Sequence, residues 1–227
     1  MRFRAVLPLA ISLACAALFV RLGVWQLARL QEKRAFNAIL AQRIVAPPVN
    51  VTGLPADTAL GHYRRVSASG ALLYDREVVY AGRSHEGSPG VNLLTPMKIA
   101  GHDTLVMVNR GWAYSSDAAQ IANERWREKD SATVAGYAET FAGKERASTA
   151  RRVHALDRAA IEALVGLPVA PYILVETSDS TKHADSIPVR LEVPRPDEGP
   201  HQSYAIQWFS FALVAVVGGV ALSRKNR

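Results

Sequence analysis

The distribution of apolar residues divides the chain into two long apolar runs at the ends and a mixed segment between them. The first run covers residues 5–25 and contains one charged residue, Arg21, whereas the second covers residues 204–222 and contains none. Nineteen helical residues extend over about 28 Å, which matches the hydrocarbon core of a bilayer. The pattern therefore predicts two transmembrane helices, over residues 5–25 and 204–222.

The first run has a second interpretation, as a cleaved export signal. Only sixteen residues of it precede Arg21, and Ser12-Leu13-Ala14-Cys15 resembles a lipoprotein cleavage site among small residues that would also suit signal peptidase. However, residues 22–25 extend the apolar run, and the long side chain of Arg21 can reach the interface. Trp25 would then lie in the aromatic belt. We expect an uncleaved anchor.

Basic residues outside both runs predict the orientation. Arg2 and Arg4 precede the first run, and a tail of residues 223–227 with three basic side chains follows the second. Short basic tails stay in the cytoplasm, whereas the basic residues just after the first run belong to a long loop and count for less. We expect cytoplasmic tails at 1–4 and 223–227 and a periplasmic segment at 26–203. A long presequence rich in Arg and Ser is not expected, which favours a bacterial inner membrane over a mitochondrial one.

The middle segment, residues 26–203, reads as short strands separated by turn residues. Seven strands are expected, over residues 66–72, 77–81, 91–95, 104–109, 133–138, 172–176 and 189–193. Pro96 should end the third strand and Gly111 should follow the fourth. Helices are expected over 116–127 and over 157–165, the second with the acidic Asp157 as its first residue and Gly166 as its C-cap. Pro47-Pro48 and residues 188–200 look like extended linkers. We therefore predict a membrane-anchored α+β fold, with an antiparallel sheet or small barrel and short helical insertions.

Composition and motif content argue against several classes of function. The net charge of +7 is scattered and partly flanks the apolar runs, so we expect a lipid bilayer as partner and no nucleic acid. The single cysteine, Cys15, lies in the first run, which rules out an intrachain disulfide and a thiolate metal site. The sequence lacks the common nucleotide-binding, zinc-protease and hydrolase motifs. We expect a protein that is not an enzyme, with a membrane-tethered periplasmic enzyme as an alternative.

Three clusters stand out from this background. Residues 22–29 (LGVWQLAR) leave the first run, residues 108–112 (VNRGW) end a predicted strand, and residues 201–209 (HQSYAIQWF) enter the second run. Together with YRRV at 63–66, Gly70, GSPGV at 87–91 and Thr95-Pro96, they resemble the Surfeit locus protein 1 family of cytochrome c oxidase assembly factors. The resemblance extends from residue 22 to about residue 213 and includes the arrangement of two spans.

The resemblance implies a role in bringing haem A to subunit I of a haem-copper oxidase, with the haem A synthesis enzymes as further partners. Bacterial members of the family are associated with haem A binding, and the implicated histidine at the start of the last span corresponds to His201. Haem A would then be bound transiently. The alternative is a membrane-anchored scaffold that contacts oxidase subunits without binding haem.

Residue chemistry makes His201 the first candidate for this site. A neutral imidazole is a common axial ligand of haem iron, although the same residue at a membrane boundary can simply be hydrated. Tyr204, Trp208 and Trp25 lie near the outer boundary, where they suit either an aromatic belt or the wall of a porphyrin pocket. Gln26 and Gln207 lie at the same depth and are expected to bind across the two helices, since an unpaired polar group near hydrocarbon is costly.

Arg110 is a candidate in the middle segment. It precedes Gly111 and Trp112, which favours a turn in which the tryptophan packs into the core. In the functional alternative, Arg110 pairs with haem propionates or with an acidic partner surface through charge-assisted hydrogen bonds.

Overall fold

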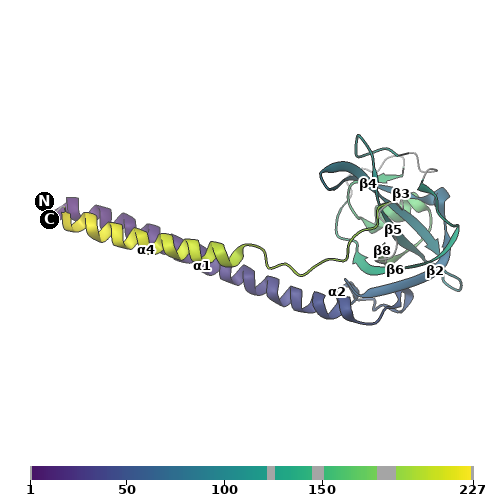
Figure 1. The fold of residues 1–227 in the computed structure, drawn as a ribbon, viewed down its shortest axis with the longest axis horizontal. Coiled ribbons are helices and arrows are strands. Elements are labelled where there is room, and N and C mark those ends of the chain that lie inside the picture. Colours follow the sequence, from purple (N-terminus) through teal and green to yellow (C-terminus); the bar gives the residue numbers. More distant parts are fainter. Residues whose placement is uncertain (1, 122–125, 145–150, 178–187, 226–227) are drawn as a thin grey trace. The chain divides into compact units, whose positions relative to one another are not determined.

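A computed structural model describes residues 2–121, 126–144, 151–177 and 188–225 of the chain. The chain divides into two compact units, one formed by residues 1–41 with 195–227 and the other by residues 42–194 (Figure 1). Each unit is considered separately below.

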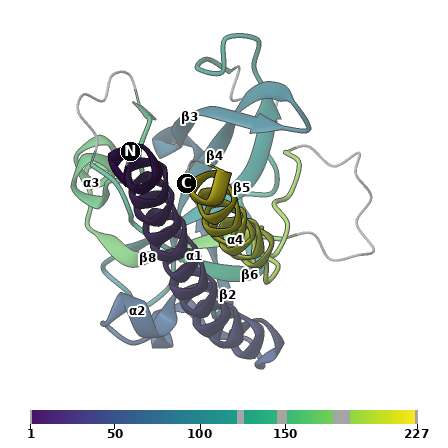
Figure 2. The same cartoon turned by 90° about the vertical axis from the view of Figure 1, so that its left-hand side faces the viewer.

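Two long helices form the first unit. α1 (Arg2–Val45) and α4 (His201–Lys225) lie side by side and antiparallel, so that both chain ends are at the same end of the pair (Figures 1 and 2). Both helices are long and apolar enough to cross a membrane. α1 continues as one helix beyond residue 25, because residues 26–45 contain neither Gly nor Pro, and it ends just before Pro47-Pro48.

The contact between these helices contains several small residues among larger ones. The more buried positions of α1 alternate three and four residues apart, and those of α4 do the same, which is the spacing of an antiparallel coiled-coil seam. These positions are Ser12, Ala16, Phe19, Gly23, Gln26 and Leu30 on α1, and Ala205, Trp208, Ala212, Ala215 and Gly219 on α4. A Cβ at Gly23 would lie 2.7 Å from Phe209, and one at Gly219 would lie 2.4 Å from the Cβ of Ser12. Small residues let transmembrane helices approach this closely.

The second unit is a closed barrel with additional strands. The barrel follows the order β2-β6-β8-β5-β4 and closes through pairing of β2 with β4; β5 and β8 are parallel, and the other barrel pairs are antiparallel. Within the described residues the strands are β1 (Val49–Asn50), β2 (Arg65–Leu72), β3 (Val78–His85), β4 (Ser88–Lys98), β5 (Leu105–Tyr114), β6 (Ser131–Thr140), β7 (Arg152–Val153) and β8 (Val169–Glu176). Short helices connect them: η1 (Val51–Gly53), α2 (Thr58–Gly61), η2 (Tyr74–Arg76) and α3 (Arg158–Val165).

Apolar side chains pack in three clusters around this barrel. The largest contains Val66, Met97, Val108, Val134 and Leu174, contributed by all five barrel strands. A second cluster joins Ile161 and Val165 of α3 to strands β3, β4, β5 and β8, and a third lies around Trp126. The predicted combination of two terminal apolar helices and a β-rich domain is confirmed.

The helix predicted over residues 157–165 is confirmed as α3. It ends at Gly166 as expected, and Asp157 is the N-cap residue that precedes its first turn. Asp157 accepts hydrogen bonds from the backbone N–H groups of Ala159 and Ala160, and Gly166 ends the helix with φ 76°. These are the residue types that satisfy the free donors of a helix start and the left-handed geometry of a helix end.

The predicted helix over 116–127 is wrong in its described part, because residues 116–121 form turns and an irregular segment. Asp117 accepts hydrogen bonds from the backbone N–H groups of Gln120 and Ala119 and from the hydroxyl of Ser115, and these lower its pKa to about 2. A side chain that binds nearby backbone in this way competes with helix formation. Residues 122–125 of the predicted helix lie outside the described residues.

Two predicted strand ends are also wrong. β4 passes through Pro96, because it pairs with β3 up to Leu94 and with β2 from Met97, so the proline lies where β4 changes partner and no ladder N–H is needed. β5 passes through Gly111 and Trp112 and ends at Tyr114, so these residues do not form a turn.

The predicted strand over 189–193 is reduced to two isolated bridges, Trp112–Val189 and Thr177–Leu191. Gly111, with φ 125°, permits this crossing, since a Cβ there would lie 2.2 Å from the carbonyl oxygen of Val189. A glycine inside a strand commonly marks such a close approach of another backbone.

Candidate functional site

The two helices of the first unit bring His201 and Gln26 together. His201 is the first residue of α4, and its Nδ1 lies 2.8 Å from Oε1 of Gln26. Because an amide oxygen only accepts, a neutral imidazole here donates from Nδ1. Gln26 is only 9% exposed and lies in the contact seam of α1. With Nδ1 as the donor, Nε2 carries the lone pair, which is the form of imidazole that binds a metal ion. The expectation of binding across the two helices is confirmed for Gln26, whereas Gln207, for which the same was expected, is exposed on α4.

The segment that leads into His201 is tied to α1. The guanidinium of Arg34 donates to both carboxylate oxygens of Glu198, at 2.9 and 3.0 Å. Next to it, Asp197 accepts the backbone N–H of Gly199, which has φ 65°. Both partners of the ion pair are about half exposed, so it contributes little stability, but its two-point geometry defines the direction in which the chain enters α4.

Aromatic side chains pack two helical turns deeper in the pair. Trp208 stacks on Phe19, with ring centroids 5.7 Å apart and planes at 24°, and Phe211 contacts both rings. Trp208 therefore packs mainly against α1. Trp25 and Tyr204 are 54% and 43% exposed, so their rings are accessible. Trp25 directly precedes Gln26 in the sequence, and Tyr204 follows His201 by three residues.

Arg110 belongs to the second unit, where it is completely buried on β5. Its guanidinium donates to Thr95, to Glu77, to the carbonyl of Trp126 and to Glu128, at 2.6–2.9 Å. Burial alone would lower the pKa of Arg110, but the charge of Glu77 and the hydrogen bonds to both carboxylates outweigh it, so the net pKa is raised. The barrel thus uses this side chain as an internal cross-link; its pairing with a propionate or a partner remains a prediction.

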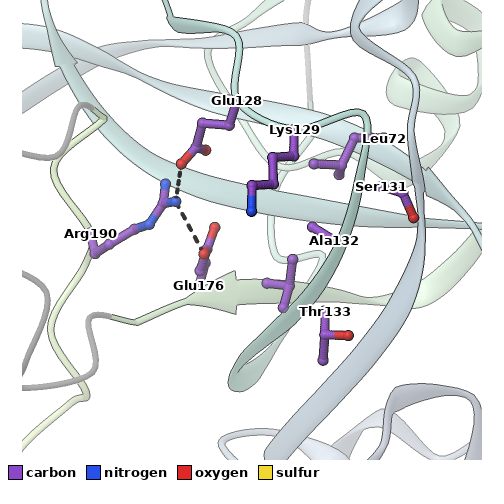
Figure 3. A pocket seen from close by; sticks show the side chains of 9 residues that line it. Leu72, Glu128, Lys129, Ser131, Ala132, Thr133, Glu176 and Arg190 are labelled. Atoms are coloured by element: carbon purple, nitrogen blue, oxygen red, sulfur yellow. Dashed lines mark hydrogen bonds and ion pairs between the residues drawn. The ribbon is translucent and has the colours of Figure 1, made fainter.

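A surface hollow of about 580 Å³ lies beside this network (Figure 3). It is lined by Leu72, Glu128, Lys129, Ser131, Ala132, Thr133, Val134, Glu176 and Arg190. Arg190 bridges Glu128 and Glu176 and also donates to the carbonyl of Arg110. Its charge is thus matched by two carboxylates. The charged side chains that line the hollow therefore form a structural ion-pair network, and we do not assign a catalytic site to it. Among the described residues, no group of three acidic, His or Cys side chains could hold a metal ion.

Comparison with known proteins supports the resemblance seen in the three clusters. The model of the SURF1 family matches residues 13–213. This chain belongs to the SURF1 family. A SURF1-like protein of Rickettsia conorii is 25% identical over 218 residues, covering 92% of this chain and 88% of the relative. An uncharacterised SURF1-like protein of Mycobacterium tuberculosis is 27% identical over 224 residues, covering 94% and 80%. A SURF1-like protein of Monosiga brevicollis is 31% identical over 107 residues, covering 43% and 41%.

Membership of the SURF1 family implies a role in cytochrome oxidase assembly, and the two apolar helices indicate a membrane protein. The family match covers α1 from residue 13 onward, the barrel, and α4 up to residue 213. It includes three residues that the sequence analysis did not single out: Phe19 and Phe211, which pack on Trp208, and Arg34, which pairs with Glu198. The sequence contained a signal for Phe19: it precedes Gln26 by seven residues, which places both side chains on one face of the helix.

Proposed function

We propose that this SURF1-family protein assists the assembly of a haem-copper cytochrome c oxidase by holding haem A at the outer end of the α1–α4 pair and passing it to subunit I. The observation that supports this proposal is the hydrogen bond between His201 and Gln26, which in the neutral imidazole leaves the lone pair of Nε2 free to bind a metal ion. The imidazole is half buried and its orientation is held from the neighbouring helix.

The residues around His201 fit a porphyrin. Its Nε2 would bind the iron, while the exposed rings of Trp25 and Tyr204 provide apolar surface for the macrocycle. Trp208, packed on Phe19, would form the deeper limit of the site. Haem A, when bound, would supply an iron that can accept a histidine nitrogen, while the chain would supply this nitrogen and apolar walls.

In this proposal both termini are cytoplasmic and the barrel is in the periplasm of a bacterium. The short basic tails support this orientation. The site then lies at the outer face of the inner membrane. We propose a non-enzymatic role, because the chemistry rests on binding and release.

The proposal predicts that His201→Ala removes haem from the purified protein. The full chain is expressed with and without the haem A synthesis enzymes, purified in detergent, and its visible spectrum is recorded. We expect the wild type to show a Soret band that shifts on reduction, and His201→Ala to fall to background while it still inserts into the membrane. His102→Ala, an exposed histidine of the barrel unit, is the matched control and should keep the wild-type spectrum.

Two results would count against this function. An unchanged haem content in His201→Ala would remove the site, and a colourless wild type co-expressed with the synthesis enzymes would support a scaffold that contacts oxidase subunits without haem.

A further inference from the structure

The acceptor that holds His201 is a neutral amide. Metal-binding histidines commonly donate their second ring N–H to a carboxylate or a backbone carbonyl, and this partner fixes the tautomer and tunes the basicity of the ligand. We propose that Gln26 is a positioning residue that fixes the His201 tautomer and keeps the histidine a weak, releasable ligand. This inference rests on the proposed function of the site.

The first part concerns the tautomer. The bond joins residues 175 positions apart, and the Gln26 side chain is buried between the helices, so its amide has little freedom to turn away. In a neutral imidazole, an acceptor at Nδ1 selects the tautomer with the proton on Nδ1, and this tautomer carries its lone pair on Nε2. The helix contact thus prepares the ligand nitrogen before any haem arrives.

The second part concerns ligand strength. A carboxylate acceptor makes an imidazole more electron-rich and a stronger ligand of iron, whereas an amide does so less. The two acidic residues nearest to His201 in sequence are both engaged elsewhere: Asp197 with the backbone N–H of Gly199, and Glu198 with Arg34. Neither supplies the acceptor. A protein that must pass its haem on benefits from this arrangement, because a weaker ligand raises the rate of release.

The tautomer can be tested without haem. The haem-free full chain, labelled with ¹⁵N-histidine and held in detergent micelles, is examined by NMR for the protonated ring nitrogen of His201. We expect Nδ1–H in the wild type, and loss of that preference in Gln26→Leu. Gln207→Leu, which removes an exposed amide from α4, should leave the His201 signals unchanged. A wild-type tautomer in Gln26→Leu would overturn the positioning role.

Ligand strength is tested on the haem-loaded protein by measuring haem transfer to apomyoglobin. We expect Gln26→Glu to slow release roughly tenfold and to lower the reduction potential, and Gln26→Leu to speed release, since removing such a partner typically changes metal affinity by about 10- to 100-fold. Wild-type rates and potentials in both variants, with haem still lost in His201→Ala, would overturn this inference and leave the proposed function intact. A wild type that takes up no haem would overturn the proposed function and the release role together, while the NMR result would still decide the tautomer.

Discussion

At the scale of single residues, the buried Arg110 shows how a charge can be kept inside a small barrel. Its guanidinium is fully buried next to Glu77, which is also buried, and it reaches Thr95 and Glu128 as well. Transfer of a charge from water is costly unless it is paired and hydrogen-bonded, and this site meets both conditions. The same network extends through Glu128 to Arg190, and so ties the segment around Val189 to the barrel.

Removal of this guanidinium should destabilise the protein strongly. Arg110→Leu leaves the carboxylate of Glu77 buried without its partner, so we expect a loss of about 3–5 kcal/mol in the free energy of unfolding. Urea denaturation of the full chain in detergent, followed by circular dichroism, measures it. Arg127→Leu is the control, because its ion pair with Asp130 is exposed and should change stability by less than about 1 kcal/mol. Equal effects of the two substitutions would contradict the structural role of Arg110.

At the scale of elements, glycines decide how closely strands and helices approach. In the barrel, a Cβ at Gly136 of β6 would lie 1.8 Å from the carbonyl oxygen of Val175 on β8, whereas a Cβ at Gly53 would meet no atom within 4 Å. In the helix pair, Gly219 faces Ser12, whereas Gly218 faces open space. Adjacent glycines in one sequence thus have different structural roles.

Gly136→Ala should push β6 and β8 apart. The new methyl group would meet backbone, which cannot turn aside, so we expect a loss of about 1–3 kcal/mol in stability. Gly53→Ala should be close to neutral. The midpoints of thermal unfolding of the two variants, measured side by side, decide the matter, and a stable Gly136→Ala protein would show that β6 and β8 do not pair as described.

Gly219→Leu should weaken the pairing of α1 and α4, because the larger side chain would occupy the position of Ser12. We expect a loss of about 1–3 kcal/mol in helix association, by the same overpacking argument. Titration with sodium dodecyl sulfate, followed by the fluorescence of the tryptophans that include Trp208, reports the separation. Gly218→Leu adds the same volume on the exposed face and should unfold like the wild type; the prediction fails if the two variants behave alike.

At the scale of the whole molecule, the antiparallel pairing of the terminal helices places the N- and C-termini at one end of the pair (Figure 1). If that end is cytoplasmic, His201 and Gln26 lie at the opposite, periplasmic end of the α4 span. The location of the site therefore follows from the orientation of the helices.

Cysteine labelling tests this orientation. In a Cys15→Ala background, His102→Cys should react with a membrane-impermeant maleimide in intact spheroplasts, because the barrel is expected in the periplasm. Lys225→Cys should react only after lysis. The reverse pattern would invert the topology and place the proposed haem site at the cytoplasmic face.

Much of this architecture was predictable from local pattern. The terminal runs predicted two apolar helices, and Asp157 with Gly166 predicted α3, because hydropathy and capping act over a few residues. The same local signals failed at Pro96 and Gly111, where the backbone conformation depends on which distant strand or segment lies alongside. A proline interrupts a strand only where the neighbour needs the N–H that proline lacks, and a glycine only where the neighbour needs the side chain that glycine lacks.

The sequence by itself determined the membrane helices, the β-rich domain between them and, through the three clusters, the family. The tertiary structure decided how the named residues are used. It paired His201 with Gln26, assigned Trp208 to packing against Phe19 and placed Arg110 inside the barrel. The physical reason is separation along the chain: the hydrogen bond between His201 and Gln26 depends on the register of two antiparallel helices, and no local pattern contains that register.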